Sequence, residues 1–206
     1  MTTFLGNTQC SDFKINFPGL KTKHGSLYWP ITRAESSHHP RMQLCKEDAP
    51  LRLPFGVSTF EGNARLNLDM SISENNKDIK EWFNNFDQWV INTVFKNRHE
   101  LFPKKPNLTI EGLTDMYTPC LNSKDDFDPI LRTKANSSVL LFVRNEDGSS
   151  TKGTLDDITP GTICCPIVSI DKVWCMSASK WGVTLVTQAI QIWPRKERAL
   201  SDIFQF

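Results

Sequence analysis

KVWCMSASKWGVTLVTQAIQIW, residues 172–193, reads as two long β-strands joined through Lys180-Trp181-Gly182. The second limb alternates apolar and polar residues with a period close to two, which is typical of a half-buried strand. Aromatic and basic side chains gather beside the turn. The hairpin therefore has two interpretations: it closes an ordinary β core, or it presents a surface on which nucleobases stack.

The composition is that of a globular protein with room for one sizeable domain. The chain has 206 residues, 39% of them hydrophobic, and no stretch reaches the ~20 apolar residues of a membrane helix. The N-terminus lacks the pattern of a secretory signal, so we expect an intracellular protein without membrane contact. Its net charge of +1 is not that of a protein that coats duplex DNA through charge alone. A nucleic-acid partner therefore requires cations gathered on one face.

The cysteines, histidines and acidic residues do not show the spacing of a metal-binding or catalytic site. The six cysteines form no C-x-x-C pair, so we expect free thiols in a reducing compartment rather than metal ligands or a disulfide framework. His38-His39 and the acidic group Asp125-Asp126 with Asp128 are interpreted as solvated. No hydrolase, phosphate-loop or dinucleotide motif occurs. The sequence favours a protein that is not an enzyme and that uses no cofactor or metal.

The chain divides into three regions. Residues 1–50 predict an irregular N-terminal arm, because proline and glycine interrupt every periodic run. Its apolar residues indicate packing in patches, with a flexible link around 33–50; alternatively, residues 12–17 pair as an extra strand. Residues 51–194 form the main domain, and residues 195–206 form a C-terminal tail.

One long helix is predicted over residues 77–95. Apolar side chains recur there at spacings of three and four and make one broad stripe opposite polar residues. Residues 73–76 offer N-cap candidates before it. Although the stripe is strongly aromatic, we interpret it as a surface that faces the core.

Strands are predicted on both sides of this helix. Before it lie residues 52–57 and 65–72, joined by a turn at 61–63. Asp147-Gly148 supplies a tight hairpin turn after it. The later strands are predicted at residues 108–110, 114–120, 129–135, 139–144, 151–155 and 162–170. This order predicts an α+β, mainly β, domain built on a barrel or sandwich.

Basic and aromatic side chains on these strands suit single-stranded nucleic acid. Such binding needs cations along the phosphates and flat side chains that accept stacked bases. The two-residue period puts Arg132 and Lys134 on one face of their strand, with Leu131 and Thr133 on the other. The candidate residues are Arg132, Lys134, Phe142, Arg144, Lys152, Trp174, Lys180 and Trp181, with Tyr117 as a weaker addition. For the two tryptophans, burial in the core is the alternative.

The order of these segments resembles the OB-fold single-stranded DNA-binding proteins of bacteriophages and large DNA viruses. The matching segments are LRLPFGVS (51–58), EWFNNFDQWVINTVF (81–95), YTPCLNSKDDFDPILRTKA (117–135) and KWGVTLVTQAIQIW (180–193). The resemblance implies an OB-like five-stranded barrel that binds single-stranded DNA, or RNA, in replication, recombination or repair. It also implies phosphate contacts for Arg132 and Lys134, and aromatics near the bound strand beside the final hairpin.

The C-terminal tail departs from that family. RKERALSDIFQF, residues 195–206, is mixed in charge, whereas the family's tails are often strongly acidic and recruit replication proteins. Recruitment through the tail, self-association, and a location in a host nucleus or cytoplasm are expectations. Two other classes stay open: a viral structural or capsid-type or protein-interaction β-domain whose arm docks a neighbouring subunit, and a small enzyme with scattered site residues.

Overall fold

The computed structural model describes residues 2–23, 26–59, 66–124, 126–136, 138–176 and 179–193. The predicted turn at 61–63 and the C-terminal tail lie outside the described residues, as do Arg65 and Asp125. The helices are α1 Lys77–Lys96, α2 Arg98–Leu101 and α3 Ile110–Asp115, with short 3-10 turns η1 Leu5–Asn7, η2 Cys10–Asp12, η3 Glu74–Asn76 and η4 Leu155–Asp157. The strands are β1 Thr3–Phe4, β2 Phe13–Ile15, β3 Leu20–Lys21, β4 Leu27–Arg33, β5 Arg41–Gln43, β6 Leu51–Leu53, β7 Val57–Thr59, β8 Leu66–Ser71, β9 Tyr117–Thr118, β10 Leu121–Lys124, β11 Phe127–Ala135, β12 Leu140–Arg144, β13 Ser150–Lys152, β14 Thr162–Met176 and β15 Lys180–Trp193.

Five strands close into a barrel. β6 pairs with β8 and β14, β8 pairs with β11, and β15 closes the ring by pairing with both β11 and β14. The contact between β11 and β15 is parallel and the other four are antiparallel. In chain order the ring therefore reads 1-2-3-5-4, the arrangement of an OB-like barrel. The predicted fold, α+β and mainly β with one long helix, is confirmed.

Apolar residues at every second position fill the barrel. Leu68, Leu131 and Ile190 are fully buried there. Thr133 and Thr187 bring their hydroxyl oxygens within 2.7 Å of each other in the interior, so each of these polar groups has a partner. Leu131 and Thr133 face inward while their neighbours Arg132 and Lys134 are exposed, as the two-residue period predicts.

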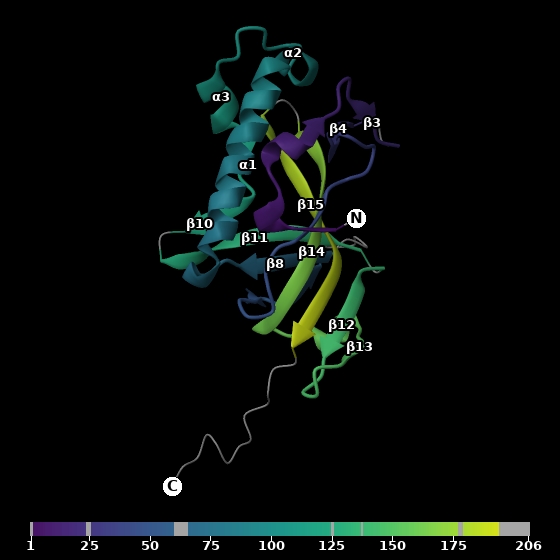
Figure 1. Ribbon diagram of the computed structural model, residues 1–206. Helices are drawn as coiled ribbons and strands as arrows, with labels where there is room; N and C mark the ends of the chain where they lie inside the picture. The colour runs from purple at the N-terminus through teal and green to yellow at the C-terminus, as the bar shows by residue number, and fades with distance from the viewer. Residues whose placement is uncertain are drawn as a thin grey trace.

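The hairpin of β14 and β15 is longer than the barrel, as Figure 1 shows. The strand predicted at 162–170 and the first limb of the hairpin form one continuous strand, β14. β14 ends at Met176 and β15 begins at Lys180, so the expected connection through Lys180-Trp181-Gly182 is wrong. Gly182 is instead a strand residue opposite Trp174, and a Cβ there would stand 3.0 Å from the indole ring. The glycine thus permits the Trp174 indole ring to approach the β15 backbone closely, and it does not form a turn.

The N-terminal segment occupies the edge that this long hairpin offers. β4 and β5 both pair with β14, and β2 pairs with β4. The alternative of an extra strand at residues 12–17 is confirmed as β2. The region expected to be a flexible link contains β5. Because an unpaired strand edge exposes backbone hydrogen-bonding groups, this pairing also protects β14.

Helix α1 runs along one side of the hairpin with the N-terminal segment against it (Figure 1). Trp82 stacks on Phe86 with ring centroids 5.2 Å apart, and its indole nitrogen donates to the Thr8 carbonyl at 2.7 Å. Phe13 from β2 meets Phe86 edge-on at 6.2 Å. The aromatic stripe therefore faces the core, as predicted. Over the described residues, no helix has the length and apolar character that crossing a membrane requires.

Four of the predicted strands differ from the structure. Residues 52–57 divide into β6 and β7 around Gly56, whose φ of +67° suits a residue without a Cβ. Helix α3 occupies residues of the strands expected at 108–110 and 114–120, the second of which keeps only β9, and the Thr109 hydroxyl caps this helix by accepting the Gly112 N–H at 3.2 Å. The strand expected over 151–155 ends at Lys152 and gives way to η4.

Candidate nucleic-acid interface

One row of side chains crosses four barrel strands, β8, β11, β15 and β14, and continues onto β5. Strand register pairs Arg41 with Ser169, Ser169 with Val186, Val186 with Lys134, and Lys134 with Asn67. Because directly paired residues point to the same side of a sheet, all five lie on one face. We call this the outer face. Arg41 and Lys134 are exposed on it, so two cations stand in line across the barrel.

Exposed apolar side chains lie beside this row on the same face. Gln43 and Ile167 continue it two residues along β5 and β14, and Ala189 pairs with both Ile167 and Leu140. On β12, Leu140 is 56% exposed and Phe142 is 40% exposed. Exposed large apolar groups beside cations are the combination that a stacked and charged ligand uses.

A cavity of about 680 Å³ opens beside the row. Its floor is β14 and β15, and its wall is the segment that leads from β4 to β5. The lining residues are Arg33, Ser36, Ser37, His38, His39, Arg41, Ser169, Asp171, Val186 and Gln188. Val186 and Arg41 belong to both the row and the cavity, so the two form one continuous surface.

Arg132 is exposed on the outer face but already has a partner. Its Nε and Nη2 donate to the two carboxylate oxygens of Asp69, both at 2.9 Å. These hydrogen bonds raise the pKa of Arg132, which keeps the guanidinium charged. Two of its five N–H groups are used by Asp69, so the remaining three are available to a phosphate.

The β12–β13 hairpin carries the next part of the predicted site. Phe142 pairs with Lys152 across it, so the aromatic side chain and the exposed lysine lie on the same side of the hairpin. Arg144 is half-buried and contacts Glu47 at 3.4 Å. The structure thus places Arg132, Lys134, Phe142 and Lys152 on the same face, with Phe142 opposite Gln191, five residues along β15 from Val186, and it holds Arg144 next to an acid.

The tip of the long hairpin is a different environment. Trp181 is 0% exposed, its ring lies 4.6 Å from that of Tyr117, and its indole nitrogen donates to the Leu113 carbonyl at 2.9 Å. The prediction that a base stacks on Trp181 is therefore wrong, because this side chain belongs to the core. Lys180 is exposed but lies six residues along β15 from Val186, or about 20 Å. Trp174 is half-buried against Gly182.

Sequence reasoning missed the contribution of the N-terminal segment. Arg33 and Arg41 line the cavity, and neither was a candidate. His39 was interpreted as solvated, yet its Nδ1 lies 2.7 Å from the Ile31 carbonyl oxygen and its Nε2 lies 3.5 Å from Asp171. The only available signal was the recurrence of cations at residues 33 and 41 on either side of the histidine pair.

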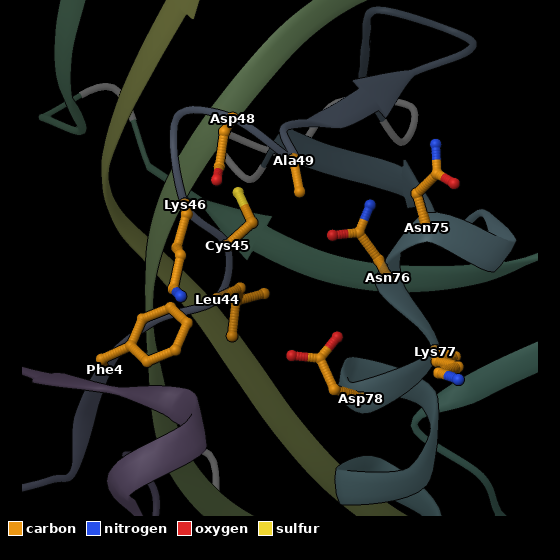
Figure 2. A pocket seen from close by; sticks show the side chains of 10 residues that line it. All are labelled: Phe4, Leu44, Cys45, Lys46, Asp48, Ala49, Asn75, Asn76, Lys77 and Asp78. Atoms are coloured by element: carbon orange, nitrogen blue, oxygen red, sulfur yellow. The ribbon is translucent and has the colours of Figure 1, made fainter.

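Other parts of the surface offer no comparable arrangement. A second cavity, of about 310 Å³, lies between the N-terminal segment and the start of α1 (Figure 2). Lys46 and Lys77 line it together with Asp48 and Asp78, so its charges are mixed. Within the described ranges, no group of three or more His, Cys, Asp or Glu side chains could hold a metal ion.

No protein-family model and no curated protein matches the sequence. Similar solved structures include gp2.5, a single-stranded DNA-binding protein encoded by bacteriophage T7, with a TM-score of 0.48 and 9% identity over 74% of this chain and 88% of that one. The single-stranded DNA-binding protein from bacteriophage Enc34 in complex with ssDNA has a TM-score of 0.40 and 8% identity, over 87% and 96%. Its C-terminal truncation gives 0.41 and 8%, over 88% and 97%. At such identities, the assignment of the interface rests on the side chains of this chain.

Proposed function

We propose that the chain binds single-stranded DNA without reading its sequence, through the outer face. The observation that carries this proposal is the row from Arg41 to Lys134 beside the exposed Phe142. Phosphates attract cations whatever the base, and every base has a flat face that stacks. The combination therefore favours binding that depends on salt and tolerates any sequence.

The position of the side chains suggests the path of the strand. Arg41, Lys134 and Lys152 would contact phosphates, and the outward N–H groups of Arg132 would join them. Phe142 would accept a base, with Leu140 extending the apolar contact. The strands that correspond to positions two and three of an OB barrel are β8 and β11, whose outer side is where such barrels commonly bind oligonucleotides. Binding of this kind would protect single strands in replication, recombination or repair.

Fluorescence anisotropy with a labelled oligothymidylate of roughly 20 nucleotides tests the proposal, since one OB fold covers fewer nucleotides than that. We expect binding at low salt that weakens steeply between about 50 and 200 mM salt. The double variant R41A/K134A should bind more weakly and with a shallower salt dependence. K14A, which removes an exposed lysine from β2, is the matched control and should bind like the unmodified chain.

Failure to bind at low salt would refute the proposal, and equal losses in K14A and R41A/K134A would refute the assigned face. Duplex DNA and single-stranded RNA of the same length, used as competitors, distinguish the preferred nucleic acid. The proposal contains no catalytic step, so the oligonucleotide should be recovered at its original length.

A further inference from the structure

Cys45, two residues after the end of β5, faces Cys165 on β14. Gln43 is the register partner of Ile167, and the next residue, Leu44, donates its N–H to the Pro166 carbonyl at 3.2 Å. One further step places Cys45 opposite Cys165, and the two sulfur atoms lie 3.2 Å apart. Directly opposed residues of antiparallel strands have the Cα separation that a disulfide requires. The sulfurs would need to approach by only about 1 Å more.

The hydrogen bonds around this pair make the two thiols unequal. The Cys45 thiol donates to the Cys165 sulfur, and the Gln43 amide donates to the same sulfur at 3.7 Å. The hydrogen bond from Cys45 lowers the pKa of Cys165 and raises that of Cys45. Cys165 is therefore the better nucleophile of the pair, since the thiolate is the reactive form.

Both cysteines line a cavity, although their side chains are buried. Cys165 lines a cavity of about 220 Å³ on the outer face, next to Phe142 and Gln191. Cys45 lines the cavity of about 310 Å³ shown in Figure 2. The neighbouring Cys164 points instead into the barrel, where it is fully buried. A small oxidant can thus enter the cavities beside the pair, whereas Cys164 is 0% exposed.

We propose that Cys45 and Cys165 form an intramolecular disulfide when the protein meets a two-electron oxidant such as hydrogen peroxide. The Cys165 sulfur attacks one peroxide oxygen, which breaks the O–O bond and gives a sulfenic acid and one water. The Cys45 sulfur then attacks the sulfenic sulfur, the S–S bond forms, and the displaced hydroxide leaves as a second water with the Cys45 proton. Two thiols are oxidised and one peroxide is reduced. The proposal does not rest on the proposed nucleic-acid binding, although Cys165 borders the outer face.

Thiol counting and peptide mapping test the proposal on the full chain. After limited peroxide, alkylation under denaturing conditions should find four free thiols in place of six. A non-reducing digest should contain one linked species joining the peptides of Cys45 and Cys165, which dithiothreitol separates. C164S should give the same linked species and the loss of two thiols, because it leaves the pair intact.

C45S and C165S should each abolish the linked species. In C45S, Cys165 should instead carry a sulfenic or sulfinic acid, detected by its added oxygen. A linkage that involves Cys164, or six alkylatable thiols after a peroxide dose that oxidises free cysteine completely, would overturn the proposal. The measurement on the unmodified chain stands even where a serine variant fails to fold.

Discussion

The outer face and the tip of the β14–β15 hairpin carry the same kinds of residue and use them differently. On the outer face, Phe142 is 40% exposed with Lys152 beside it. At the tip, Trp181 lies beside Lys180 in the sequence, but its ring is enclosed and its N–H is bonded to Leu113. A polar group that already has a buried partner holds the fold together, whereas an exposed ring is available to a ligand. The contrast predicts that substitutions at the tip change stability and substitutions on the outer face change binding.

The largest effect is expected from Trp181→Ala. The substitution removes a fully buried ring and leaves the Leu113 carbonyl without its donor, so the free energy of unfolding should fall by about 3–5 kcal/mol. Denaturant unfolding measures this loss. Trp174→Ala, at a half-buried ring on the same hairpin, should cost less. If W181A keeps its unfolding midpoint and binds DNA more weakly, the hairpin tip contributes to binding rather than to stability, which contradicts the comparison.

Asp87→Ala is expected to come next, because Asp87 joins helix α1 to the segment around β9. Its carboxylate accepts from the Tyr117 hydroxyl at 2.6 Å and from the Cys120 N–H at 3.1 Å. Removing it leaves both donors unpaired in a buried site, at a cost of about 1–3 kcal/mol. Burial raises the pKa of Asp87 above its ordinary 3.8.

The raised pKa gives this cost a pH dependence. The folded state binds more protons than the unfolded state just above pH 3.8, so the stabilisation from Asp87 declines as the pH rises through that range. The difference in unfolding free energy between the unmodified chain and D87A should therefore be greater near pH 4 than at pH 7. A difference that grows with pH would contradict the assigned cause.

On the outer face, Phe142→Ala should weaken DNA binding by about 1–3 kcal/mol and leave stability nearly unchanged. Phe127→Ala is the matched control, because Phe127 is 74% exposed and lies seven residues before Lys134 on β11. Anisotropy titrations of both variants provide the measurement. If both variants lose the same affinity for DNA, the loss does not depend on the position of the ring, and Phe142 has no specific role in stacking a base.

The smallest effect is expected from Lys152→Ala. One lost phosphate contact should reduce the slope of log affinity against log salt by about 0.7. Titrations at several salt concentrations resolve such a change. If K152A keeps the full slope while R41A/K134A loses part of it, the bound strand passes over the row but not over the β12–β13 hairpin.

The sequence predicted the elements whose residues repeat with a clear period. The strict alternation before α1 predicts β8, and the alternation around Arg132 predicts which side of β11 is exposed. Helix α3 was missed because a six-residue helix has too few turns to show a period, and its residues Ile110 and Thr114 favour strands. Thr109, a residue type that favours the N-cap position, was a stronger local signal for a helix than the residue period.

The sequence predicted interface residues that share one strand, but not those that become neighbours only through the pairing of distant strands. Arg132 and Lys134 are two residues apart, so their shared face follows from strand geometry. Arg41 and Lys134 are neighbours only through the registers of β5, β14, β15 and β11, and register depends on the closed barrel. Trp181 was wrongly predicted for a related reason, because no local sequence pattern distinguishes a buried indole from an exposed one.

Amide hydrogen exchange with and without bound oligothymidylate tests the central claim most directly, because it reports on both regions in one measurement. The outer-face assignment predicts slower exchange on binding in peptides that cover residues 38–43, 132–134, 140–143 and 186–191. It predicts little change in residues 110–118 and 180–183. Protection confined to the hairpin tip and α3, with none on the outer face, would contradict it.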